Sequence, residues 1–422
     1  MNMRMQPQRT PAEAALVDAF DERLSLLPGD GAVMVKRDAA IEVVKAGLPT
    51  RRVESWHYTD FRRMLTAVPA YDQTAKAEAK QPVLADATVL AVLNGVASTR
   101  IPEIEGVTVS RLEDKLSDGS FAPAMALAGP DDAIGAINAA FVADGYFVDI
   151  APGAELAAPL ELQNVQAGGQ THVRFPVRVG AGAKATIVER QTGTGAAFVS
   201  SVGHLLIGEG ADVVYIIVQD QPEDATHLGQ FNADIGANGK LTLFVMNAGG
   251  KLVRQEVRVR ASGEGAYFTL RGVNLLAGDG HTDVTMVLDH AVPHTGSTEV
   301  IRNVVTGKAR GVFQGRINVH QYAQKTDAKM ACNTLLLSDD GEFSTKPELE
   351  IFADDVVCGH GATVTEIDRD HLFYLMARGI DEKTARGLLV KAFLAEVIEE
   401  LEEEPIVEAL EARLDAWFAT HG

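Results

Sequence analysis

Four glycine-centred turns recur at nearly constant spacing along the chain: Gly180-Ala181-Gly182-Ala183, Gly208-Glu209-Gly210-Ala211, Gly236-Ala237-Asn238-Gly239 and Gly263-Glu264-Gly265-Ala266. Their first glycines are 28, 28 and 27 residues apart, and short runs rich in Val, Ile, Leu, Phe and Thr lie between them. Such runs bounded by glycine are typical of β-strands. Because each repeated unit can bury its apolar face only against its neighbours, the pattern predicts a β-helix-like solenoid. A β-sandwich would end within roughly 100 residues, and propeller blades need about 40–50 residues each.

The repeats belong to a longer β-rich zone, residues 145–366, in which no long helical pattern occurs. Residues 1–144 are predicted to form a mostly helical region with some short strands and a linker. Residues 367–422 are predicted to be helical, with Asp381 as an N-cap and a last helix after Pro405. The predicted fold is therefore mainly β, with a β-helix core between an N-terminal helical (α/β) region and a C-terminal helical domain.

Composition limits the possible functions of the 422-residue chain. It has 38 Lys and Arg against 58 Asp and Glu, a net charge of −20, which disfavours nucleic-acid binding. Its two cysteines, Cys332 and Cys358, cannot form a Cys₄ zinc site or a four-thiolate cluster site. Few thiols and no signal-peptide pattern suit the reducing cytoplasm. No apolar run approaches the ~18 residues of a membrane helix, so we expect no membrane partner.

Common catalytic motifs are missing from the sequence. It contains no Gly-x-x-x-x-Gly-Lys-[Ser/Thr] phosphate loop and no Gly-x-Ser-x-Gly elbow. A cytoplasmic carbohydrate-acting β-helix enzyme is an alternative, but Asp354 and Asp355 would point to opposite faces of a strand and could not form an acid/base pair. His290 and His294 are four residues apart with Pro293 between them. We interpret them as polar loop histidines.

The densest group of candidate residues is PELEIFADDVVCGHGAT, residues 347–363. On a strand, Cys358 and His360 would project from the same face and supply half of a tetrahedral site for a soft metal. Gly359 and Gly361 would leave room for a close approach by another backbone or a cluster. Two ligands bind metal poorly, so another chain would have to complete the site. The spacing alone also fits a buried cysteine beside a surface histidine, and Cys332 lies in an apolar run that favours the core.

The run 347–363 resembles the signature of the SufB/SufD family of iron–sulfur cluster assembly proteins. The resemblance continues in RGVFQGRI (residues 310–317), QKTDA (324–328) and FYLMARGI (373–380). It also includes ESWHYT (54–59), where the family usually has Lys or Arg in place of His57. Within the family the chain is more similar to the SufD branch, because it is shorter, has fewer cysteines and carries Gly-Ala-Thr after Cys-x-His. Thr365 departs from the glycine common in that branch.

The resemblance implies a right-handed parallel β-helix that pairs with SufB through the β-helix cores. It also implies that the C-terminal helices bind the ATPase SufC, with Tyr374, Arg378, Gly379 and Ile380 as the candidate contact residues. ATP hydrolysis would then belong to SufC, which would explain the missing phosphate loop.

The same resemblance places His360 opposite a SufB cysteine, as a ligand of the nascent cluster or its iron, with Cys358 as a second candidate. It implies no cofactor held stably by the isolated chain and only a transient iron–sulfur cluster at the SufB interface. The expected function is a non-enzymatic scaffold. A self-associating structural protein is a further alternative, because a homodimer could form when SufB is absent.

Overall fold

The computed structural model describes residues 9–72 and 74–421. Helices and short strands make up the N-terminal region: α1 (Pro11–Arg23), η1 (Leu24–Leu26), α2 (Gly31–Ala46), η2 (Glu54–Trp56), α3 (Phe61–Met64), β1 (Thr88–Leu93), β2 (Val96–Ala97), β3 (Val107–Arg111), α4 (Leu112–Ser117), η3 (Ala122–Met125) and α5 (Ala133–Phe141). Three helices end the chain: α6 (Arg369–Ala377), α7 (Glu382–Glu399) and α8 (Glu404–His421).

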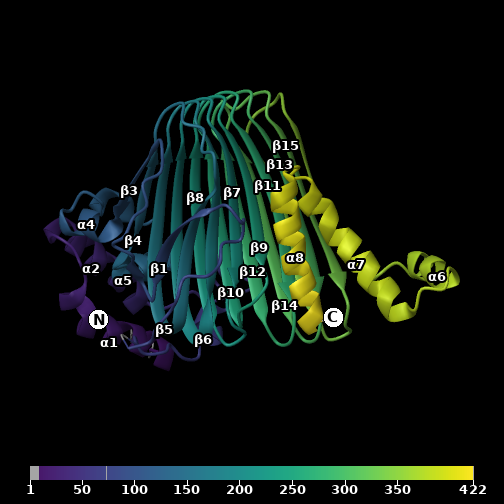
Figure 1. The fold of residues 1–422 in the computed structure, drawn as a ribbon, viewed down its shortest axis with the longest axis horizontal. Helices are drawn as coiled ribbons and strands as arrows, with labels where there is room; N and C mark the ends of the chain where they lie inside the picture. Colours follow the sequence, from purple (N-terminus) through teal and green to yellow (C-terminus); the bar gives the residue numbers. More distant parts are fainter. Residues whose placement is uncertain (1–8, 73, 422) are drawn as a thin grey trace, which may run out of the picture.

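Between these regions lies a long stack of strands (Figure 1). They are β4 (Asp144–Ile150), β5 (Leu160–Val179), β6 (Lys184–Ile207), β7 (Asp212–Asp220), β8 (Thr226–Ile235), β9 (Lys240–Asn247), β10 (Leu252–Ala261), β11 (Tyr267–Leu276), β12 (His281–His290), β13 (Gly296–Val305), β14 (Arg310–Val319), β15 (Asp327–Leu336), β16 (Glu342–Ile351) and β17 (Val357–Thr365).

The stack is a parallel β-solenoid with two faces, as the repeats predicted. From β7 onward each strand pairs in parallel with the strand two places along the chain, so the odd-numbered strands form one face and the even-numbered strands the other. We call these the odd face and the even face. Strands on the even face begin at residues 226, 252, 281, 310 and 342, so one turn takes 26 to 32 residues. The odd face also includes β1, which pairs in parallel with β5.

The repeated glycines are required by the turns. Gly182, Gly210 and Gly265 have φ values of 66°, 65° and 77°, in the left-handed region that side chains disfavour. Asn238, with φ of 54°, takes the equivalent place in the third turn. A Cβ on Gly208 would lie 2.6 Å from the backbone nitrogen of Ala181, because successive turns stack closely. The glycine repeat in the sequence therefore reflects the backbone conformation and close stacking that each turn requires.

A column of amide side chains stacks inside the odd face. Its members are in register on successive strands: Asn164, Gln191, Gln219, Asn247, Asn274 and Asn303, with the hydroxyl residue Thr334 next in register on β15. Nδ2 of Asn247 donates to Oδ1 of Asn274 at 2.7 Å, and Nδ2 of Asn274 donates to Oδ1 of Asn303 at 2.7 Å. These bonds link three successive asparagines in the interior and favour the alignment of their strands, whereas Oδ1 of Asn247 has no hydrogen-bond partner among the described residues. The sequence analysis did not identify this column.

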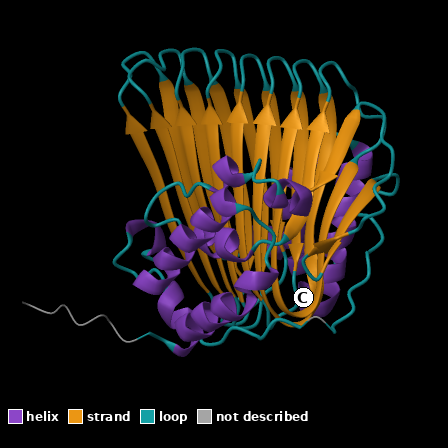
Figure 2. Ribbon diagram, turned by 90° about the vertical axis from the view of Figure 1, so that its left-hand side faces the viewer, coloured by secondary structure: helices purple, strands orange, loops and turns teal. Residues whose placement is uncertain are grey.

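The N-terminal helices cover the even face (Figure 2). Apolar residues of α5 share a core with Phe198, Leu228 and Leu252 of that face. The fully buried guanidinium of Arg37 joins α2 to α5, donating to the carbonyl oxygens of Ala139, Ala140 and Val142 and to that of Pro28. The N-terminal region is therefore held together by Arg37 and packed on the solenoid through α5.

The C-terminal helices α7 and α8 cover the odd face, whereas α6 extends away from the solenoid (Figure 1). Leu394, Leu410 and Trp417 pack on apolar residues of the odd face. Asp381 caps α7 as predicted, accepting a hydrogen bond from the backbone N–H of Thr384 at 3.1 Å. Within the described residues, none of the helices combines the length and apolar character that a membrane crossing requires.

Candidate functional site

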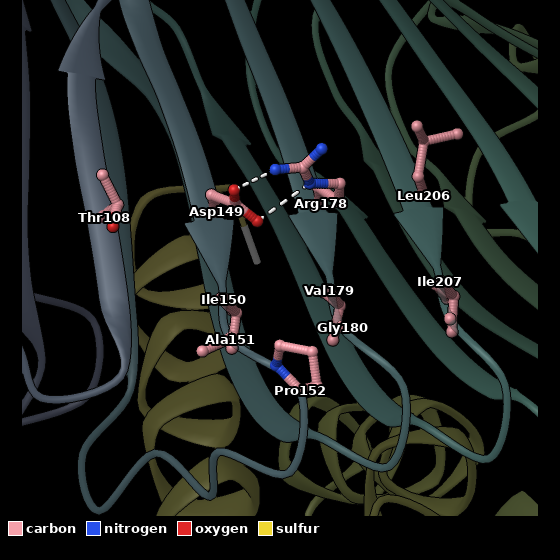
Figure 3. A pocket seen from close by; sticks show the side chains of 11 residues that line it. Thr108, Asp149, Ile150, Ala151, Pro152, Arg178, Val179, Gly180, Leu206 and Ile207 are labelled. Atoms are coloured by element: carbon pink, nitrogen blue, oxygen red, sulfur yellow. Dashed lines mark hydrogen bonds and ion pairs between the residues drawn. The ribbon is translucent and has the colours of Figure 1, made fainter.

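The first end of the solenoid is closed by an antiparallel pairing of β3 with β4 and by the N-terminal helices. A groove of about 540 Å³ lies there, where Thr108, Asp149, Arg178 and Leu206 stand side by side on successive strands (Figure 3). Nε of Arg178 donates to Oδ1 of Asp149 at 2.9 Å. Among the described residues, the groove is lined by no cysteine, histidine or unpaired carboxylate, so we assign no chemistry to it.

The other end of the solenoid is open. Within the described residues, β16 pairs only with β14 and β17 only with β15, which leaves two free strand edges. Ala328, Met330 and Cys332 of β15 are buried, and their register partners on β17 are Cys358, His360 and Ala362. In-register residues of parallel strands point to the same side, so these three side chains face the interior side of the solenoid. No further turn of the described residues lies above them.

Apolar surface surrounds this open end. Phe343 and Leu349 on β16 are the register partners of buried Gly311 and Ile317, and both are only partly covered. Phe352 is 65% exposed and Val357 is 63% exposed. Natural proteins rarely leave free edges and large apolar groups together in solvent, because such surfaces pair with other chains. The open end therefore combines two free strand edges with exposed apolar side chains.

Cys358 and His360 stand on this uncovered rung. Cys358 is half-buried against the core, and His360 is exposed beside Met330. Burial raises the pKa of the Cys358 thiol, and the nearby carboxylates of Asp327 and Glu299 raise it further, against a hydrogen bond at Ala328 that lowers it. The thiol therefore has to lose a proton when it binds a metal. Together the two side chains offer two ligands, which leaves further positions of a tetrahedral ion for a partner.

Two buried residues lie beneath this rung. Cys332 is a core residue, as predicted: it is fully buried, accepts a hydrogen bond from Nδ2 of Asn303 at 3.3 Å, and burial raises its pKa to about 11. Glu299 is in register with Met330 and so stands two rungs below His360. Burial raises the pKa of the Glu299 carboxyl to about 8. The sequence analysis did not identify Glu299. It is two residues from the buried Ile301 on the same strand, so both side chains point to the interior.

Replacing Glu299 by glutamine should remove a pH dependence of stability. The folded-state pKa of about 8 lies above the ordinary value of 4.5, so the folded protein keeps a proton that the unfolded chain releases. Stability therefore falls as pH rises from about 4.5 to about 8, by at most about 1.4 kcal/mol per pH unit. Urea unfolding of Glu299→Gln should lack this slope and give the more stable protein at pH 8. Exposed Glu264→Gln is the control, and an unchanged slope in Glu299→Gln would contradict the assignment.

Two predictions about loop and strand residues need correction. His290 is not a polar loop histidine: it ends β12, is fully buried, and its Nδ1 lies 2.8 Å from Oγ1 of Thr295. Burial lowers its pKa to about 4. His294 does lie in the following turn, with φ of 58°. Asp354 and Asp355 lie in the turn before β17 instead of on a strand, and Asp355 forms an ion pair with Lys325.

The residues predicted to contact SufC lie together at α6. The Nη2 group of Arg378 donates to the hydroxyl of Tyr374 at 3.0 Å, and its guanidinium stacks on the same ring. Gly379 has φ of 90° and turns the chain toward α7, and half-buried Ile380 packs on the core under α7 and α8. An exposed apolar group, which we call the α6 patch, stands out on this helix: Phe373, Tyr374 and Met376, at 72%, 58% and 42% exposure.

These features define a β-solenoid protein with one closed end, one open end and a projecting helix, a form suited to assembly with other chains. Comparison with protein families agrees: the family model described as "SUF system FeS cluster assembly, SufBD core domain" matches residues 162–393. The chain therefore belongs to the SufBD family of iron–sulfur cluster assembly proteins.

Individual relatives identify the branch of the family. The chain is 28% identical to the iron–sulfur cluster assembly protein SufD of Escherichia coli K12, over 88% of this chain and 90% of that protein. It is 25% identical to a SufBD family protein of Mycobacterium leprae, over 89% and 92% of the two chains. A SufBD family protein of Synechocystis is 33% identical over 48% of this chain and 45% of its own length. The chain is of the SufD type.

Proposed function

We propose that this chain is a non-enzymatic scaffold subunit of the cytoplasmic SUF machinery that pairs with SufB through its open end. The observation that carries the proposal is the position of Cys358 and His360 on the last rung, which no other turn of the described residues covers. A partner with the same solenoid architecture could continue both faces by pairing with the free edges of β16 and β17. The partly covered apolar residues at this end would then be buried between the two subunits.

The nascent cluster is the cargo of this interface. A neutral imidazole and a thiolate are ligands suited to iron and to iron–sulfur clusters. His360, the more exposed of the two, supplies one ligand across the interface, and Cys358 lines the site or supplies a second. SufB supplies the remaining ligands, so the isolated chain holds no stable cluster.

ATP hydrolysis by SufC enters the assembly through the C-terminal helices. The α6 patch offers apolar side chains on a helix that extends away from the solenoid, which suits docking of a separate domain. The neighbouring helix α7 contacts β11 and β13, and Arg302 of β13 forms a 2.7 Å ion pair with Glu396 of α7. Movement of two SufC subunits toward each other would therefore strain the solenoid pair and open its interface.

Co-expression of the tagged chain with SufB and SufC should yield one complex of all three proteins under anaerobic purification. Phe373→Asp should lose SufC and retain SufB, because it places a charge in the middle of the α6 patch without disturbing buried groups. Val35→Asp, at a 65% exposed position of α2, is the matched control and should retain both partners. Recovery of the chain only as a self-paired species beside abundant SufB would contradict the proposal and favour a homodimer. Point variants are preferable to removal of residues 368–422, which would uncover the odd face.

A further inference from the structure

The turn that joins β14 to β15 is longer than its neighbours. It consists of residues 320–326, seven residues against five in each of the turns 262–266, 291–295 and 352–356. All of these turns lead from the even face to the odd face, and they form the row above the arrowheads in Figure 2, away from the N-terminal helices. Because β14 and β15 stay in register with β12 and β13, the two additional residues extend this turn beyond the strand ends.

Tyr322 is the most exposed apolar residue of this longer turn. Its side chain is 72% exposed, and among the large apolar side chains of the described residues only Phe373 of the α6 patch is as exposed. The next residue, Ala323, is fully buried and belongs to the solenoid core. The backbone beside Tyr322 is therefore anchored in the core while the aromatic ring stands in solvent.

Hydrogen bonds hold the backbone on both sides of Tyr322. The N–H of Ala323 donates to the carbonyl oxygen of His320 at 2.8 Å, and the N–H of Gln324 donates to the carbonyl oxygen of Tyr322 at 2.9 Å. Oγ1 of Thr326 donates to the carbonyl oxygen of Ala323 at 2.9 Å. A turn that is already held in one conformation loses little entropy when another molecule covers it, which favours its use as a contact.

The last turn of the solenoid, residues 352–356, is bonded directly to the longer turn. The N–H of Lys325 donates to the carbonyl oxygen of Asp355 at 2.7 Å, and the N–H of Asp355 donates to Oε1 of Gln324 at 2.9 Å. The Lys325 ammonium group also forms an ion pair with Asp355. Tyr322 is thus one turn from the open end, and because neighbouring strands lie about 4.8 Å apart, it is about one strand spacing below the last rung.

The apolar surface of the open end continues to this turn. Phe352 and Val357, at the two ends of the last turn, are 65% and 63% exposed. The backbone N–H of Phe352 donates at 2.9 Å to Val319, the residue directly before the longer turn. We call Tyr322, Phe352 and Val357 the corner patch. Exposed polar residues flank it in the two turns: His320, Gln321, Asp354 and Asp355. Aromatic side chains within a polar rim are typical of the anchoring part of a protein interface.

We infer that the partner solenoid overhangs this corner of the open end and covers Tyr322 together with the last rung. The inference rests on the proposed function, in which the partner continues the solenoid beyond β16 and β17. A partner confined to the strand edges leaves Tyr322 in solvent, whereas a partner whose first turn reaches back by one strand spacing buries it. The corner contact adds apolar burial to strand pairing and fixes the rotation of the partner about the solenoid axis.

Titration of the full-length chain with purified SufB tests the inference. Tyr322→Ala should weaken the affinity about tenfold, because a tyrosine anchor at an interface contributes more than about 1 kcal/mol, and Tyr322→Phe should retain most of the affinity. Tyr267→Ala is the matched control. Tyr267 is 41% exposed and begins β11 on the same edge of the solenoid, but β11 is three strands before β17 on the odd face. This variant should bind as the parent does.

Phe352→Asp in the same titration separates the inference from the proposed function. Parent affinity in Tyr322→Ala beside a loss in Phe352→Asp would overturn the inference and leave pairing through the open end intact. Parent affinity in both variants would overturn the inference and the proposed function together. Equal losses in Tyr322→Ala and Tyr267→Ala would also overturn the inference, because an overhang of one strand spacing does not reach β11. Loss of self-association in Tyr322→Ala, with SufB binding unchanged, would assign the corner to a second copy of this chain and overturn the inference.

Discussion

Replacing His360 by alanine should abolish productive cluster assembly while the complex with SufB and SufC remains intact. His360 is exposed in the isolated chain, so its removal should change stability by no more than about 0.5 kcal/mol. Loss of one of the few ligands of a shared cluster should reduce the yield of cluster at least tenfold, since removing even an outer partner of a ligand costs about 10–100-fold. The measurement is visible absorbance and iron content after anaerobic reconstitution with iron, sulfide, SufB, SufC and ATP.

Two further variants define what a His360→Ala result means. His57→Ala removes another exposed histidine, on the even-face side of the molecule, and should leave the yield unchanged. Cys358→Ser should reduce the yield less than His360→Ala, because Cys358 is half-buried against the core. A full yield from His360→Ala would contradict its role as a ligand. A complex that no longer forms would show instead that His360 is needed for pairing.

Replacing Phe352 by aspartate should weaken the affinity for SufB at least tenfold. The Phe352 side chain is 65% exposed, and its backbone N–H donates to the carbonyl oxygen of Val319 at 2.9 Å, so its position beside β16 is fixed. Burial of a phenylalanine side chain contributes about 1.5–3 kcal/mol, and each 1.4 kcal/mol is about tenfold in affinity. An aspartate there would also have to lose its hydration in the interface.

The matched control for this variant is Leu206→Asp. Leu206 is also a large apolar residue, 55% exposed, but it lies at the closed end of the solenoid. Binding to immobilised SufB should be lost with Phe352→Asp and kept with Leu206→Asp. Equal effects of the two substitutions would indicate general loss of solubility or folding, and a loss confined to Leu206→Asp would place the interface at the closed end.

The solenoid could be predicted from sequence because its turns repeat a backbone requirement. Positive φ at Gly182, Gly210 and Gly265 favours glycine or asparagine in each turn, so the repeat can be recognised from the amino-acid sequence. That β1 belongs to the odd face could not be predicted from the sequence. Thr88 pairs with Leu160, and no local pattern records a partner 72 residues away.

Only the part of the candidate site that lies on a single strand could be predicted from the sequence. Alternation along one strand was enough to place Cys358 and His360 on the same side. The amide column and Glu299 require the register between strands, which decides whether a polar residue points inward. A cavity between residues 51–69 and the even-face strands is lined by residues from position 51 to position 344, so only the folded chain brings them together. His290 was misjudged because a nearby proline suggested a loop, whereas β12 continues to that residue.

The central claim is that the open end formed by β16 and β17 is the surface that pairs with SufB. Hydrogen–deuterium exchange of the chain alone and in complex with SufB tests it directly, because free strand edges exchange until another strand pairs with them. The account predicts strong new protection in residues 342–351 and 357–365, and none in β3 and β4 at the closed end. Unchanged exchange in 357–365, with protection appearing at the closed end or over the N-terminal helices, would contradict it.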